Sequence, residues 1–202
     1  DGLFVIPARG GLEHKVAEFV RSYWTLRNPI RRLDWMPDSR HVVVSGADRA
    51  SGLKRLVLVD TTSGKQTTLT NPQTRPNAEL YGDAEPAVSP DGRAVAFTRG
   101  TLSGQTLHLL TLSGDMRPAG EPREMAVGRR SRSPAWAPDG REIVFLLGSH
   151  LARIPLADGA TPRELLALGT DIMTPTVSQT GRLAFSRSTH DTNIWRQEVP
   201  AG

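Results

Sequence analysis

The chain has 202 residues, of which 38% are hydrophobic, 23% are charged and none is cysteine. This composition is typical of a globular chain and excludes disordered proteins, disulfide-rich scaffolds and thiolate metal sites. The net charge of +4 comes from basic residues that are mostly spread along the chain, so we do not expect nucleic-acid binding. The apolar runs are far shorter than the roughly 18 to 20 residues of a spanning helix, so we do not expect membrane insertion.

The first 28 residues predict an incomplete repeat unit. Two apolar segments, 3–6 and 14–19, flank the pair Gly10-Gly11 and are expected to form two strands. The stretch from Leu12 to Asn28 fits a helical period almost as well as a strand followed by a loop. We expect the strand. The apolar residues with helical spacing are Val16, Phe19, Val20, Tyr23 and Trp24.

A tight-turn motif recurs four times, roughly every 40 to 50 residues. In its clearest copy, Ser89-Pro90-Asp91-Gly92-Arg93, proline presets φ, aspartate tolerates the bridge region and glycine completes the turn. Such a turn joins two strands. The other copies are Ala137-Pro138-Asp139-Gly140-Arg141 and the weaker Met36-Pro37-Asp38-Ser39-Arg40 and Ser178-Gln179-Thr180-Gly181-Arg182.

The segment after each turn is apolar at every position, so both faces of this strand should be covered by neighbouring layers. A third strand, a glycine turn and a more polar fourth strand follow, and together these features are typical of a propeller blade. The sequence therefore predicts an all-β fold, a β-propeller segment of about four four-stranded antiparallel blades with the first strand innermost. The expected units are 1–28 (partial), 29–75, 80–127, 130–168 and 172–202 (partial), and since both partial units supply a third strand, we expect an incomplete ring with missing blades.

Residues 134–145 and 86–97 resemble the WD-like repeat of the TolB-type propeller superfamily, in which proline, an apolar residue and tryptophan precede Ser-Pro-Asp-Gly-Arg and Ile-Ala-Phe. The resemblance covers about the whole chain, with departures at Ser39 and at Gln179-Thr180. Residues 191–196 also resemble a segment found in bacterial regulators and kinases that carry such a propeller.

The resemblance implies a non-catalytic sensing or protein-interaction domain of a larger bacterial regulatory or envelope protein. A protein partner, a periplasmic rather than cytoplasmic location and no cofactor are expected on this basis. The alternative is a gating or substrate-binding propeller of a serine peptidase or a lyase whose catalytic part lies outside this segment. Oligomeric state and ligand are left open.

No residue pattern predicts catalysis or a metal site. Each aspartate of the repeated turns supplies one carboxylate, whereas calcium takes six to eight oxygen ligands, so we expect these aspartates to stabilise turns. The five histidines lack ligand spacing, and no Gly-x-Ser-x-Gly nucleophile elbow is present. Those histidines are His14, His41, His108, His150 and His190. Three tryptophans, Trp35, Trp136 and Trp195, are expected to pack between blades.

Charged residues flank the expected starts of the innermost strands. Arginines precede two of these strands and acids lie near two others, so the mouth of the ring should be mixed in sign. If a partner docks there, these side chains, which we expect to be solvated, matter more to binding than to folding. The candidate residues are Arg31, Arg32, Glu85, Arg130, Arg132 and Asp171.

Overall fold

A computed structural model describes residues 2–19, 33–47, 52–72, 80–101, 104–125, 130–165 and 171–187. Every regular element in these ranges is a β-strand, which confirms the predicted all-β class. No helix long and apolar enough to cross a membrane occurs within them. The strands are β1 (Gly2–Val5), β2 (His14–Glu18), β3 (Leu33–Trp35), β4 (His41–Ala47), β5 (Lys54–Asp60), β6 (Gln66–Thr68), β7 (Leu80–Val88), β8 (Ala94–Thr101), β9 (Gly104–Thr111), β10 (Arg123–Glu124), β11 (Ser131–Trp136), β12 (Glu142–Leu147), β13 (His150–Pro155), β14 (Arg163–Glu164), β15 (Ile172–Val177) and β16 (Leu183–Arg187).

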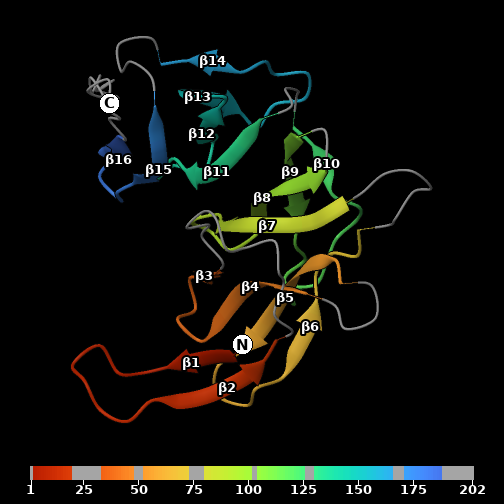
Figure 1. Ribbon diagram of the computed structural model, residues 1–202, viewed down its shortest axis with the longest axis vertical. Coiled ribbons are helices and arrows are strands. Elements are labelled where there is room, and N and C mark those ends of the chain that lie inside the picture. Colours follow the sequence, from red (N-terminus) through yellow and green to blue (C-terminus); the bar gives the residue numbers. More distant parts are fainter. Residues whose placement is uncertain are drawn as a thin grey trace, which may run out of the picture.

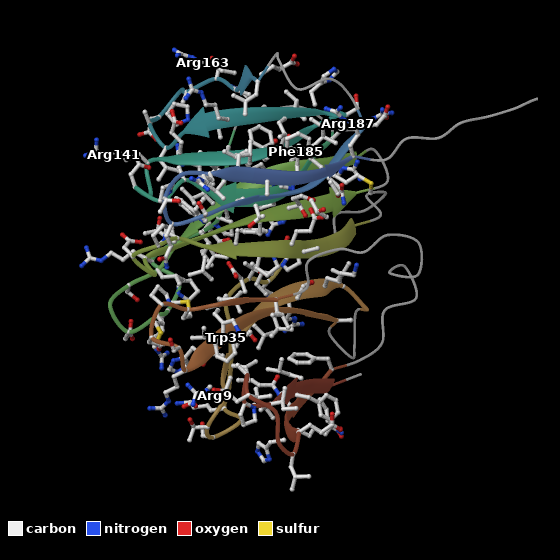
Figure 2. All side chains as sticks on the ribbon, turned by 90° about the vertical axis from the view of Figure 1, so that its left-hand side faces the viewer. Arg9, Trp35, Arg141, Arg163, Phe185 and Arg187 are labelled. Carbon is white, nitrogen blue, oxygen red and sulfur yellow. The ribbon has the colours of Figure 1, made fainter. Side chains whose placement is uncertain are left out.

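The strands form three antiparallel four-stranded units, β3 to β6, β7 to β10 and β11 to β14, flanked by the pairs β1–β2 and β15–β16. A parallel pairing of β5 with β7, at Lys54 and Gly82, joins the first two units into one eight-stranded sheet. Figure 1 shows the units in chain order along the long axis of the molecule, from β1 and β2 at the bottom, through β3 to β10, to β11 to β14 at the top, with β15 and β16 beside this last unit. From the side, in Figure 2, the strands of successive units lie above one another. This layering is the arrangement of propeller blades.

The repeated motif forms the expected turn between the first and second strands. In each copy the fourth residue donates its N–H to the carbonyl of the first, at 2.9 Å from Gly92 to Ser89. Gly92, Gly140 and Gly181 have φ between 68° and 78°, a left-handed conformation that glycine adopts without strain. Ser39 takes φ 57° at the position where the motif usually has glycine.

The second strands are buried on both faces, as predicted. In β8, Val95 and Phe97 pack toward the preceding unit while Ala96 packs toward the following one. In β12, Ile143 and Phe145 likewise face the preceding unit. Four apolar layers result, one between each pair of neighbouring units, and this stacked burial holds the blades together.

The fourth strands are polar, as predicted. Directly after β10, Met125 donates its N–H to the Leu107 carbonyl at 2.8 Å and packs between the second and third units. Directly after β14, Leu165 donates to the Leu151 carbonyl at 2.8 Å and packs toward β15 and β16. Near the N-terminus, residues 14–18 form β2, which confirms the strand prediction for that part. Residues 20–28 lie outside the described part of the chain.

Candidate functional site: the axial face

The innermost strands contain a repeated bulge at a residue followed by proline. Glu85, Ser133 and Thr174 each precede a proline, and their φ values are 54°, 52° and 43°. The pairing of the first strand with the second shifts register where each of these three residues meets its proline. Positive φ is uncommon in residues other than glycine and is often found at functional sites. Because the bulge accommodates the proline, each strand begins several residues earlier than the sequence predicts.

Glu85 therefore lies inside β7, and the expectation that it is solvated is wrong. Its side chain is only 4% exposed. The carboxylate accepts hydrogen bonds from the Ser133 backbone N–H at 2.8 Å and the Ser133 hydroxyl at 3.1 Å. The Thr98 hydroxyl lies 3.1 Å from both Glu85 Oε2 and the Ala84 carbonyl oxygen and shares its one proton between them. The bonds from Ser133 cross between the innermost strands of two units, so Glu85 links β7 to β11.

The other candidate charges differ in exposure. Arg130 is exposed in the turn before β11, whereas Arg132 is half-buried within that strand rather than in the loop before it. Asp171 is exposed immediately before β15. Arg31 and Arg32 lie outside the described residues. The structure thus places Arg130, Arg132 and Asp171 around the starts of two neighbouring innermost strands.

A hollow lies at the opposite end of the innermost strands, where they enter the repeated turns. Its volume is about 620 Å³, and first strands or turns from four successive units line it. Trp35 is 46% exposed in this lining, at the end of β3, and is labelled in Figure 2. The prediction that Trp35 packs between blades is therefore wrong, because its half-exposed side chain lines the hollow.

Two polar contacts fix the walls of this hollow. Trp136 is 8% exposed, packs between the second and third units as predicted, and donates its indole N–H to the Ala87 carbonyl at 2.8 Å. Asp34 accepts the Val88 backbone N–H at 2.8 Å. Each contact joins the first strands of two neighbouring units. The axial face, which is the surface formed by the innermost strands β3, β7, β11 and β15, is therefore a rigid scaffold rather than a set of independent loops. Trp195 lies outside the described residues.

The interface between the first two units carries a buried ion pair and a buried histidine. Asp83 is fully buried and receives two hydrogen bonds from the Arg99 guanidinium, at 2.7 and 2.9 Å. His108 stacks on Phe97 with 5.5 Å between ring centroids. Burial, together with the nearby Arg99 charge, lowers the pKa of His108 to about 4, so this imidazole is neutral at pH 7.

The turn aspartates hydrogen bond within their own turns. Asp91 accepts from the Ser89 hydroxyl at 2.6 Å and from the Arg93 N–H at 3.0 Å, and these bonds hold the pKa of Asp91 below its ordinary value. Asp38 and Asp139 likewise accept backbone N–H groups of their turns. Among the described residues, no group of three or more histidines and acids is placed to hold a metal ion.

Sequence reasoning missed the hollow and the buried role of Glu85. A signal for the bulge was present, since a proline recurs at the same column of three innermost strands, as Pro86, Pro134 and Pro175. No comparable signal marks the hollow, because the residues that line it come from units far apart in sequence.

No protein-family model matches the sequence, and no curated protein matches it. Solved structures do match. TolB from Acinetobacter baumannii has a TM-score of 0.69 at 21% identity, over 95% of this chain and 44% of that chain. A TolB-type protein from Agrobacterium tumefaciens has a TM-score of 0.65 at 18% identity, over 91% of this chain and 64% of that chain. A prolyl endopeptidase structure has a TM-score of 0.52 at 16% identity, over 77% of this chain and 25% of that chain.

These similarities show a TolB-like β-propeller fold. The chain spans less than two thirds of the length of each of these three proteins. Because they include both TolB and an enzyme, the shared fold is compatible with a binding role and with a role beside a catalytic domain.

Proposed function

We propose that the chain is a non-catalytic protein-interaction or sensing propeller of a larger bacterial regulatory or envelope protein, located in the periplasm. The observation that supports this proposal most directly is the hollow of about 620 Å³ at the ends of the innermost strands, with Trp35 half exposed in its wall. Tryptophan is enriched among the residues that dominate protein interfaces. A concave wall with an exposed aromatic side chain on a rigid scaffold is suited to recognition.

Basic residues at the end of the innermost strands opposite the hollow support a second role, in which they attract a partner before it binds. Arg130 is exposed and Arg132 is half-buried, and the sequence places Arg31 and Arg32 just before the innermost strand of the unit two blades earlier. Positive side chains near one mouth attract anionic surfaces, and this attraction weakens with salt. We propose that these arginines steer an anionic protein partner toward the axial face.

Substitutions that separate binding from folding test the proposal. Trp35→Ala and the triple change of Arg32, Arg130 and Arg132 to alanine should leave the melting temperature nearly unchanged, because surface changes typically cost within about 0.5 kcal/mol. Both variants should bind a captured partner at least about fivefold more weakly, and the arginine effect should shrink at high salt. The measurement is capture from a periplasmic extract, followed by titration of the recovered protein against each variant.

A matched control carries the same kind of charge change away from the axis. Lys65 is exposed just before the outer strand β6, and Arg163, labelled at the top of Figure 2, is exposed within the outer strand β14. Their double alanine variant should bind the partner like the parent. Equal affinity of the parent, the Trp35 variant and the arginine variant would overturn the proposal.

The similarity to a prolyl endopeptidase structure favours a second candidate, the gating propeller of a serine peptidase. The sequence that flanks this segment in its gene distinguishes the two. A hydrolase domain with a nucleophile elbow would support the peptidase, whereas an upstream winged-helix or kinase domain would support the regulator.

A further inference from the structure

Glu85 is a buried carboxylate that no cation neutralises within the part of the chain that the structure describes. Its three partners are neutral donors, two hydroxyl groups and one backbone N–H. Burying an ionised carboxylate is unfavourable unless an opposite charge or enough hydrogen bonds compensate for the lost water. The site is therefore suited to gain a positive charge.

A small pocket opens beside this carboxylate. Its volume is about 90 Å³, and its lining combines hydroxyl groups with two proline rings. The hydroxyl of Ser133 donates to Glu85, which leaves both of its lone pairs as acceptors. The lining residues are Glu85, Ser133, Pro134, Thr174, Pro175 and Thr176.

The hydrogen bonds already made by Glu85 select the kind of cation. Oε2 accepts two hydrogen bonds and Oε1 accepts one, so of about four acceptor positions on a carboxylate one remains, on Oε1. A guanidinium prefers to engage both oxygens at once. An ammonium needs only one strong acceptor and directs its other N–H groups to neighbouring hydroxyls. Calcium would need six to eight oxygens, and this pocket supplies one carboxylate.

We propose that this pocket binds an alkylammonium group, with one N–H donated to Glu85, the others to lining hydroxyls, and the alkyl stem against the rings of Pro134 and Pro175. The three bulges create the pocket, since they place Glu85, Ser133 and Thr174 at the same level of adjacent innermost strands. This binding does not depend on the protein partner proposed above, because a free alkylamine satisfies the same chemistry.

Nuclear magnetic resonance titration of the whole chain tests the site with n-propylammonium chloride as probe. The backbone amide of Ser133 donates to Glu85, so its resonance should shift in a saturable way, with a dissociation constant on the order of 10 mM. At equal ionic strength, sodium chloride and tetramethylammonium chloride should cause no saturable shift, since neither supplies an N–H donor. Methylguanidinium should bind at least about fivefold more weakly than propylammonium.

Substitutions supply the second arm. Glu85→Gln keeps the side-chain shape and removes the charge, and should weaken propylammonium binding at least about tenfold. Glu164→Gln, at an exposed glutamate of β14, should leave binding unchanged. If Glu85→Gln does not fold, the comparison of cations on the parent chain decides alone. A shift that fails to saturate, or one that tetramethylammonium reproduces, overturns the proposal.

Two further ligands distinguish the source of the ammonium group in a partner. Nα-acetyl-lysine methylamide carries it on a side chain, and glycine methylamide carries it at the start of a chain. Saturable binding of either one supports the site and identifies its source, whereas binding of propylammonium but of neither amide shows that the pocket takes a free alkylamine.

Discussion

The carboxylate of Asp34 accepts a hydrogen bond of 2.8 Å from the backbone N–H of Val88, which lies 54 residues further along the chain. The bond joins the first strands of two neighbouring units, beside the hollow. Alanine at position 34 removes the acceptor and leaves this N–H without its partner, which typically costs about 1 to 3 kcal/mol.

Asp34→Ala should therefore lower the free energy of unfolding by about 1 to 3 kcal/mol, and Asp34→Asn by less than about 1 kcal/mol, because asparagine retains an acceptor oxygen. Urea denaturation of the three proteins provides the measurement. Equal losses in the two variants would show that the bond to Val88 is not what stabilises this interface.

The two tryptophans of the axial face should respond differently to the same change. Trp136 is 8% exposed and donates to Ala87, whereas Trp35 is 46% exposed. Replacing Trp136 by phenylalanine removes this bond and leaves a void in the core, so we expect a loss of about 1 to 3 kcal/mol. Trp35→Phe should stay within about 0.5 kcal/mol of the parent. Thermal unfolding measures both, and similar losses would contradict this difference in burial.

His108 should make stability depend on pH. Its pKa is about 4 in the folded chain and 6.5 when unperturbed, chiefly because it is buried and also because Arg99 is near. Between these values the unfolded state binds more protons, so the stabilisation is full above pH 6.5 and is lost as pH falls toward 4. At pH 4.5 the loss is about 2 to 3 kcal/mol relative to pH 7.

His108→Gln removes the titrating group, so the fall in the free energy of unfolding between pH 7 and pH 4.5 should be about 2 to 3 kcal/mol smaller in this variant than in the parent. Urea denaturation at pH 7 and pH 4.5 gives the difference for each protein, and the shared carboxylate contributions cancel in the comparison. A variant with the same pH dependence as the parent would show that His108 does not contribute.

Gly82 permits a close approach between the first two units. It has φ 86°, and a Cβ at this position would lie 2.1 Å from the Lys54 carbonyl oxygen. Gly52 has φ 69° with no atom within 4 Å of such a Cβ. Alanine at position 52 should cost roughly 1 to 2 kcal/mol from backbone strain alone.

Gly82→Ala should lower the free energy of unfolding by about 2 kcal/mol or more beyond the loss in Gly52→Ala, because the added methyl collides with backbone that cannot move aside easily. Chemical denaturation of the two variants measures the difference. If Gly52→Ala and Gly82→Ala lose similar stability, the approach of Lys54 to Gly82 is not a constraint on the fold.

Local chemistry in the sequence determined the blades. The repeated turn needs proline, aspartate and a residue that tolerates positive φ, and the second strands need apolar residues on both faces. These requirements act over five to ten residues. The turn at Gly92 and the alternating burial of Val95, Ala96 and Phe97 therefore follow from the amino-acid sequence alone.

Tertiary structure alone decided which side chains face the axis. Trp35 and Trp136 occupy equivalent columns of the repeat, yet only Trp136 is covered by a neighbouring unit, and its indole N–H finds the Ala87 carbonyl there. Glu85 resembles a loop charge in sequence, but the bulge before Pro86 turns it toward Ser133 of the next unit. Such contacts join residues about fifty positions apart, and their geometry depends on how whole blades stack rather than on any local preference.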